Sequence, residues 1–127
     1  MYSSVLLDHF EHPRNSGELP EANVRVRVEN PVCADTLEMA VRLEHGVIKE
    51  LRFKAKGCVP TVACASMLTE LATGRAVSDG CVSASELIEA LGGVPQASTH
   101  AAQLAVDALC RALRQAAKVE KADAHHG

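Results

Sequence analysis

Aromatic side chains are almost absent from this chain. Its 127 residues include no tryptophan, one tyrosine and two phenylalanines. A hydrophobic core therefore has to be built from leucine, valine, isoleucine and alanine, which favours closely packed helices. Apolar residues make up 47% of the chain, so there is enough material for the core of one compact domain.

Long apolar runs and a strong excess of one charge are also missing. No run approaches the roughly 20 apolar residues that a helix needs to span a bilayer. The formal charge is −3 with both signs interspersed, which does not favour nucleic acid or an anionic membrane as the main partner. Asp8, His9 and Glu11 lie where a secretory signal would be uncharged, so we expect a cytoplasmic protein.

The cysteines are odd in number, and this argues against a disulfide framework in a chain expected to be cytoplasmic. Reduced cysteines serve as metal ligands, as nucleophiles or as small buried hydrophobes. Cys64 and Cys110 fall within helical patterns and are expected to pack in the core, whereas Cys81 is expected in a loop or at a helix cap. The five are Cys33, Cys58, Cys64, Cys81 and Cys110.

Three segments alternate apolar and polar residues with a period of two, which is typical of half-buried strands. They are residues 24–30, 36–43 and 47–57. His45 and Gly46 suit a tight turn, so the second and third segments are expected to form a hairpin.

Helical patterns account for most of the remaining chain. Val5, Leu6 and Phe10 would hold the first helix on the core. Strands followed by helices predict an α+β domain, a three-stranded antiparallel sheet with helices packed on one face. We expect this domain to cover residues 1–118, followed by a polar, frayed C-terminal tail at 119–127. The expected helices are residues 3–11, a segment from Pro60 that ends before Gly74, residues 83–91 and residues 99–118.

The first candidate ligands flank the predicted hairpin. With a two-residue turn at His45 and Gly46, Asp35 would lie opposite Lys56. The start of the second strand and the end of the third then share one end of the sheet. Residues two apart in extended chain point the same way, so Cys33, Asp35 and Cys58 can converge there.

Two further features concern the helix starts. Cys58 precedes the helix that begins near Pro60, where unpaired backbone N–H groups favour a thiolate. His100 lies in the first turn of the last helix, where the helix dipole favours a neutral imidazole able to bind a metal. The pattern alone does not bring His100 to the other three residues.

Several stretches together resemble the NifU/IscU family of iron–sulfur cluster assembly scaffolds. They span roughly residues 2 to 117 in the order in which the family has them. They are YSSVLLDHFEHPRNSGEL, NPVCAD, FKAKGC followed by ACASMLTEL and TGR, and LGGVP followed by THAAQLAVDAL. The resemblance implies the same three-stranded antiparallel sheet covered by helices.

The resemblance also implies a function and a ligand set. Members of the family build a 2Fe–2S cluster and pass it to an acceptor, as carriers and not as enzymes. The implied ligands here are Cys33, Asp35, Cys58 and His100, while Ala101 stands where the family has its third cysteine and Ala34 replaces a glycine. Two thiolates, a carboxylate and an imidazole suit Zn²⁺, and a 2Fe–2S cluster accepts histidine in place of cysteine. With two thiolates, we expect a labile cluster or Zn²⁺.

Two alternatives stay open at this point. One is a zinc-dependent sulfur acceptor that works with a cysteine desulfurase, although the connection at residues 75–82 is short where that branch carries an insertion. The other is a degenerate metal-binding paralogue without assembly activity, which the alanine at position 101 keeps open. The partners that the resemblance implies are a cysteine desulfurase, acceptor apo-proteins and a second copy of the chain.

Overall fold

The computed structural model of the chain describes residues 2–30 and 34–126, with side chains through residue 120. Within these ranges the chain forms three strands, four α-helices and two short 3₁₀ helices. In chain order they are α1 (Ser4–Glu11), β1 (Val24–Glu29), β2 (Thr36–Glu44), β3 (Val47–Lys56), α2 (Val59–Ala72), η1 (Val77–Asp79), α3 (Ala84–Ala90), η2 (Gln96–Ser98) and α4 (Thr99–His126).

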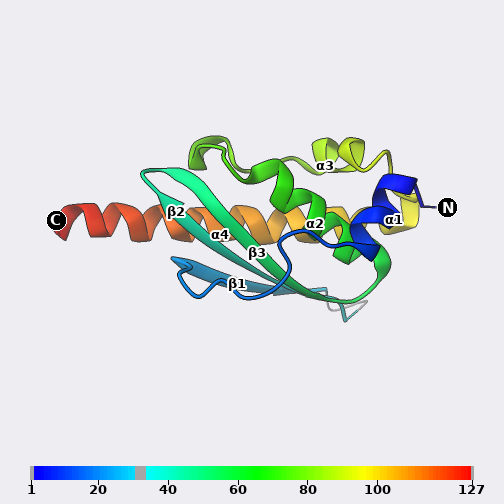
Figure 1. Ribbon diagram of the computed structural model, residues 1–127, viewed down its shortest axis with the longest axis horizontal. Coiled ribbons are helices and arrows are strands. Elements are labelled where there is room, and N and C mark those ends of the chain that lie inside the picture. Colours follow the sequence, from blue (N-terminus) through cyan, green and yellow to red (C-terminus); the bar gives the residue numbers. More distant parts are fainter. Residues whose placement is uncertain (1, 31–33, 127) are drawn as a thin grey trace.

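The three strands form one antiparallel sheet in the order β1-β2-β3. Val26, Met39 and Phe53 are paired across it and are buried on the same face. α4 packs across β1 and β2, and α2 packs against β3 and α4. Figure 1 shows α4 running the length of the molecule behind the sheet. The predicted fold class, an antiparallel sheet with helices on one face, is confirmed.

The register of the hairpin differs from the one that a simple two-residue turn predicts. Glu44 pairs with Val47 as expected, but a bulge beside Arg42 and Leu43 shifts the pairing by one residue. Thr36, and not Asp35, therefore lies opposite Lys56. A bulge adds one unpaired residue to one strand, and the alternating apolar pattern continues on both sides of it.

Aliphatic side chains build the core, as the scarcity of aromatic residues predicted. The fully buried alanines include Ala63 on α2 and Ala108 on α4, and small side chains allow packed helices to approach closely. The largest fully buried side chains are Leu6, Leu37, Met39, Ile48, Leu51, Leu68, Leu87, Leu91 and Leu109.

The side chains through which α1 packs on the core differ from those that the sequence predicted. Leu6 is fully buried, but Val5 and Phe10 are 40% and 38% exposed, so the prediction that all three hold α1 on the core is wrong. His9 is buried instead, at 4% exposure, and α1 packs on α2. A polar side chain takes this place because α2 offers polar partners for it.

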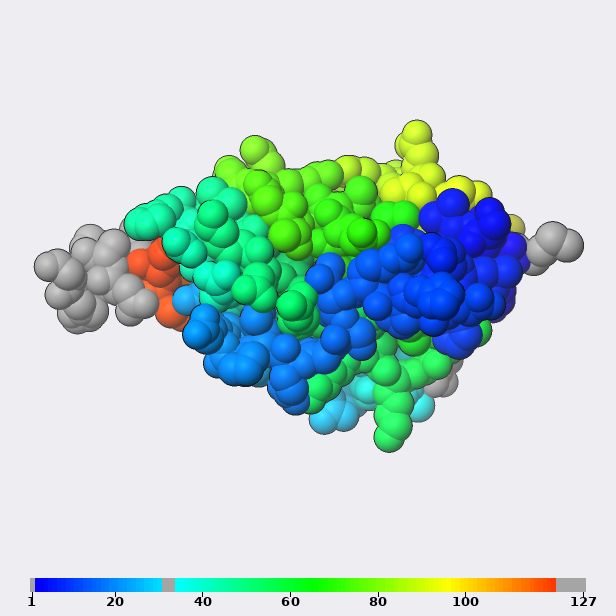
Figure 2. Space-filling model, in the orientation of Figure 1, coloured from blue at the N-terminus to red at the C-terminus, as the bar shows by residue number. Residues whose placement is uncertain are grey.

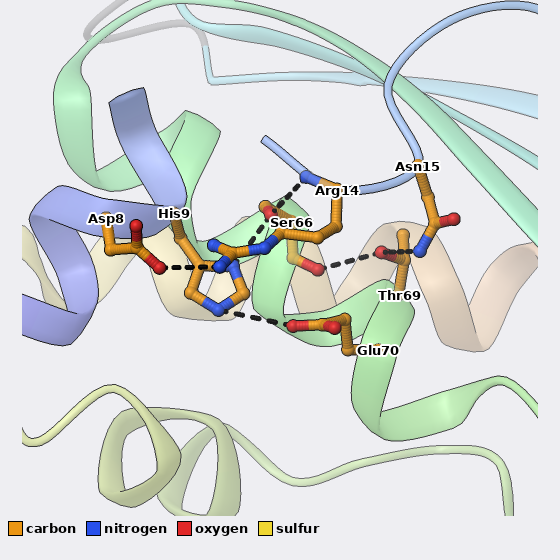
Figure 3. Close-up of polar contacts among 7 residues, drawn as sticks. All are labelled: Asp8, His9, Arg14, Asn15, Ser66, Thr69 and Glu70. Carbon is orange, nitrogen blue, oxygen red and sulfur yellow. Dashed lines mark hydrogen bonds and ion pairs between the residues drawn. The ribbon is translucent and has the colours of Figure 1, made fainter. Parts of the chain in front are cut away.

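Those partners are shown in Figure 3. His9 lies with Nδ1 2.7 Å from the Oγ of Ser66 and with Nε2 3.3 Å from a carboxylate oxygen of Glu70. The backbone N–H of Arg14 donates to the same Ser66 oxygen at 2.9 Å. Burial, followed by the nearby charge of Arg14, lowers the pKa of His9. In the neutral ring, Nε2–H faces Glu70, which can only accept, and Nδ1 accepts the Ser66 O–H.

The chain after α1 lies along the outer edge of β3. The N–H of Phe53 donates to the carbonyl of Asn15 at 3.0 Å, and the N–H of Gly17 donates to the carbonyl of Phe53 at 2.9 Å. Figure 2 shows the N-terminal segment as a continuous blue region that runs from α1 across this face of the molecule. The backbone groups of β3 at Phe53 are thus paired and not open to another chain.

The last helix is longer than predicted. It continues to His126, so the prediction that it ends at Lys118 is wrong. The carboxylate of Glu120 accepts a hydrogen bond of 2.7 Å from the N–H of Gly46 in the hairpin turn. A tertiary contact thus lies beyond the predicted helix end. The division of the chain into a domain at 1–118 and a tail at 119–127 stays a prediction.

Candidate metal centre

Three predicted ligands from different elements meet at one end of the sheet. Asp35 precedes β2, Cys58 precedes α2 and His100 is the second residue of α4. One ligand atom from each lies within 4.8 Å of the other two. The Sγ of Cys58 is 3.5 Å from Oδ2 of Asp35, and Nε2 of His100 is 4.0 Å from the same oxygen. These short distances make the three residues a candidate metal centre.

Asp35 is the buried member, with 3% exposure. Its carbonyl accepts a hydrogen bond of 2.8 Å from the N–H of Asn30, and Ala34 N–H donates to the carbonyl of Asn30 at 2.8 Å. These bonds connect Asn30, just after β1, with Ala34 and Asp35, just before β2. The predicted ligand Cys33 lies outside the described residues. Ala34 has a φ of +57°, a conformation that glycine adopts at little cost.

Cys58 is the exposed member and the N-cap residue of α2. Its carbonyl accepts hydrogen bonds from the N–H groups of Thr61 and Val62 at 3.1 and 3.3 Å. The thiol therefore lies at the positive end of the dipole of a 14-residue helix. This is the position that the sequence predicted for it.

The imidazole of His100 has one nitrogen engaged with the backbone. Nδ1 is 3.1 Å from the carbonyl oxygen of Ala97, and since a carbonyl only accepts, Nδ1 carries the hydrogen. In the neutral ring Nε2 then presents a lone pair on the side of Asp35. A backbone carbonyl that accepts from Nδ1–H is a usual arrangement for a histidine that binds a metal through Nε2.

The remaining cysteines lie where the sequence predicted. Cys64 is fully buried, and burial, followed by the charge that Cys58 can carry, raises its pKa to about 12. Cys110 packs against the core, and Cys81 is exposed between η1 and α3. Ala101 is fully buried beside His100 and offers no donor atom.

Sequence reasoning missed one polar residue of the centre. The hydroxyl of Thr61 donates to Oδ2 of Asp35 at 2.8 Å, and its oxygen is 3.2 Å from the Sγ of Cys58. Thr61 is fully buried. Its spacing could have identified it, because residues three apart share a helix face, and Thr61 follows Cys58 by three positions.

The donor set fits a transition metal. Thiolate, imidazole and carboxylate are all ligands that Zn²⁺ accepts, and sulfur and nitrogen donors also suit iron in iron–sulfur sites. A buried carboxylate such as Asp35 is stabilised by a nearby cation. The fold and this cluster define a small α+β domain with a Cys/Asp/His group at one end of its sheet.

Comparison with known proteins identifies the family. A family model described as the NifU-like N terminal domain matches residues 1–122. The chain is 36% identical over 126 residues to the iron-sulfur cluster assembly scaffold protein IscU 1 of Archaeoglobus fulgidus, covering 95% of this chain and 82% of that protein. It is 32% identical over 117 residues to the scaffold protein IscU of Haemophilus influenzae, covering 88% and 92%. The chain belongs to the NifU-like N-terminal domain family.

Solved structures share the fold. A NifU-like N-terminal protein from Brucella abortus superposes with a TM-score of 0.73 at 16% identity, covering 91% of this chain and 94% of that one. A putative scaffold protein for the SUF system from Fervidobacterium islandicum AW-1 also gives 0.73, at 17% identity, covering 88% and 96%. Within the described residues, we find no helix with the length and apolar character needed to cross a membrane.

Proposed function

We propose that this chain is a scaffold on which an iron–sulfur cluster, of the 2Fe–2S type, is assembled and from which it is transferred. The convergence of Asp35, Cys58 and His100 from three separate elements carries the proposal. Relatives that match most of the chain support it, because they are named as iron–sulfur cluster assembly scaffold proteins. In this role the protein is a carrier and not an enzyme.

Each residue has a distinct part in the proposal. The thiolate of Cys58 and the Nε2 of His100 are the donors that iron in a cluster accepts. Asp35 supplies a carboxylate, which holds such iron less firmly than a thiolate and so suits a cluster that has to be released. Cys33 is proposed as the second thiolate. With Ala101 in place of a third thiolate, we expect a labile or substoichiometric cluster, or Zn²⁺ in the isolated protein.

The proposed partners follow from this chemistry. A cysteine desulfurase would deliver sulfane sulfur, and a thiol reductant would supply the two electrons that convert each sulfur atom to sulfide. Acceptor apo-proteins would receive the cluster, and a second copy of the chain is a further proposed partner. We propose the cytoplasm as the location, since reduced cysteines persist there.

Anaerobic reconstitution tests the proposal. The protein is incubated with ferrous iron, cysteine, a desulfurase and dithiothreitol, and visible absorption from sulfur-to-iron charge transfer is recorded before and after adding an apo-ferredoxin. We expect a spectrum in the wild-type chain, its loss in Cys58→Ala, and its retention in Cys81→Ser, which changes an exposed cysteine outside the centre. Wild-type protein without such a spectrum would contradict the scaffold function.

One observation favours a second candidate function. Cys58 is exposed at a helix N-terminus, so its thiolate can attack the sulfane sulfur of a desulfurase persulfide, releasing the desulfurase thiolate and leaving a persulfide on Cys58. Persulfide labelling of Cys58 without a cluster spectrum would support the second candidate function, a zinc-dependent sulfur acceptor. Tight Zn²⁺ binding with neither result would support a degenerate paralogue that only binds metal.

A further inference from the structure

Thr61 contacts the metal centre although it is not one of the candidate ligands. Thr61 lies in the first turn of α2, and its side chain is fully buried. A threonine in a helix commonly bonds to a carbonyl in its own preceding turn. The hydroxyl of Thr61 donates instead to Asp35 Oδ2, on a different element, at 2.8 Å. The bond therefore joins α2 to the start of β2.

The hydroxyl of Thr61 also touches a second candidate ligand. A hydroxyl has one hydrogen, and a carboxylate can only accept, so the hydrogen lies between Thr61 and Asp35. The same oxygen lies 3.2 Å from the Sγ of Cys58. One buried oxygen atom thus contacts both Asp35 and Cys58, whose Oδ2 and Sγ lie 3.5 Å apart.

The carboxylate of Asp35 is confined on its other side as well. Its Oδ1 lies so close to the backbone of Gly57 that a side-chain carbon there would be 2.3 Å away. With Oδ1 against Gly57 and Oδ2 bonded to Thr61, the carboxylate plane has little freedom to turn. Oδ2 is the oxygen that faces Cys58 and His100.

We propose that Thr61 is the positioning residue of this metal centre, whose hydroxyl aims Oδ2 of Asp35 at the ion that Cys58 and His100 bind. This inference rests on the proposed metal-binding function. Outer partners that orient a metal ligand typically change metal affinity 10- to 100-fold when removed. Ordering the carboxylate before the ion arrives reduces the conformational entropy lost on binding.

Cobalt binding provides the test, because Co²⁺ reports both affinity and geometry through its absorption spectrum. Thr61→Val removes the hydroxyl at nearly constant shape, and Thr61→Ser keeps it. We expect Thr61→Val to weaken Co²⁺ binding about 10- to 100-fold and to alter the ligand-field bands, and Thr61→Ser to restore both. Thr69→Val is the matched control, since Thr69 is an equally buried threonine of α2 that bonds to Asn15 outside the centre; it should leave Co²⁺ binding unchanged.

The outcomes separate the two proposals. Thermal unfolding of the metal-free variants shows whether they fold, and Thr61→Ala replaces Thr61→Val if the valine variant does not. Unchanged Co²⁺ affinity in Thr61→Val, or an equal loss in Thr61→Ser, would overturn the role of Thr61 and leave the metal centre standing. Wild-type protein that binds no Co²⁺, or binds it equally well as Cys58→Ala, would overturn the metal centre and the role of Thr61 with it.

Discussion

The carboxylate of Asp35 lies directly against the backbone of Gly57. A Cβ at Gly57 would be 2.3 Å from Oδ1 and 2.6 Å from the carboxyl carbon of Asp35. Non-bonded atoms do not approach each other this closely. The bulge beside Arg42 brings the two residues opposite each other, because pairing Thr36 with Lys56 leaves Asp35 and Gly57 as the next pair. The glycine before Cys58 thus makes room for a ligand.

Substituting this glycine should therefore displace the candidate ligand. In Gly57→Ala we expect Asp35 to turn away from Cys58 and Co²⁺ affinity to fall by about tenfold or more. Titration with Co²⁺ followed by absorption measures this. Gly74→Ala is the control: at a φ of +93° it adds backbone strain, but no atom lies within 4 Å of the added Cβ, so the affinity should stay unchanged. An unaffected Gly57→Ala would show that the Asp35 carboxylate does not contribute to binding.

A third thiolate should make the cluster more stable. Ala101 adjoins His100 and is fully buried, so Ala101→Cys places a thiol next to the centre. We expect a higher yield of reconstituted cluster and a longer lifetime in air, because thiolates hold iron more firmly than the weaker donors they replace. Decay of the visible absorption measures the lifetime.

The control for this gain is a cysteine one turn further along α4. Ala105 is also buried, at 1% exposure, but it lies four residues beyond Ala101, away from the helix start. Ala105→Cys should leave cluster yield and lifetime as in the wild type. An equal gain in both variants would mean that any added thiol, and not its position, stabilises the cluster.

The protein should lose stability as the pH falls through the range in which histidine titrates. Burial lowers the pKa of His9 from its usual value of 6.5, even though Glu70 and Asp8 act in the opposite direction. Below pH 6.5 the unfolded chain binds a proton that the folded chain resists, so the free energy of unfolding decreases with falling pH until the lower, folded-state pKa is passed.

Urea unfolding between pH 5 and pH 8 measures this dependence. His9→Gln should be destabilised by about 1–3 kcal/mol at pH 8, because it disturbs buried hydrogen bonds to Ser66. It should also lose part of the acid sensitivity. His12→Gln changes an exposed histidine just after α1 and should keep the wild-type profile. A stability that rises as the pH falls from 6.5 would contradict this account of His9.

The protein should be more stable with glycine at position 34 than with alanine. Its φ of +57° costs an L-residue roughly 1–2 kcal/mol, whereas glycine adopts it freely but has a more flexible unfolded state. We expect Ala34→Gly to raise the free energy of unfolding by about 0.5–1 kcal/mol. Ala76→Gly, at a φ of −64°, should lower it. Thermal unfolding of both variants checks the signs, and a less stable Ala34→Gly would refute the prediction.

Glu120 should contribute to stability although it lies beyond the predicted helix end. Its carboxylate accepts the Gly46 N–H at 2.7 Å, and Glu120→Ala should lower the free energy of unfolding by about 1 kcal/mol. Glu120→Gln keeps an acceptor oxygen and should lose less. If Glu120→Ala melts at the wild-type temperature in a thermal scan, the contact does not contribute to the free energy of unfolding. The chain after Lys118 then behaves as the tail that the sequence predicted.

Most of the fold could be predicted from the sequence because its signals are local. The alternation of Val24, Val26 and Val28 and the capping serine at Ser83, which accepts the N–H of Glu86 at 3.1 Å, follow from side-chain period and helix-end chemistry. The placement of α1 was predicted less well. The apolar residues Val5 and Phe10 were expected inside, but the polar partners of His9 lie on α2, more than fifty residues away.

The sequence by itself determined the main elements and their order, since each depends on neighbours within a few residues. It proposed the candidate ligands through motifs that resemble those of the family. Only the tertiary structure decided which of these ligands meet. The bulge beside Arg42 shifted the pairing that aligns Asp35 with Gly57, and helix packing brought His100 to the same end of the sheet. The tertiary structure also placed Thr61 in contact with Asp35 and Cys58, because a contact between separate elements depends on how the whole core packs.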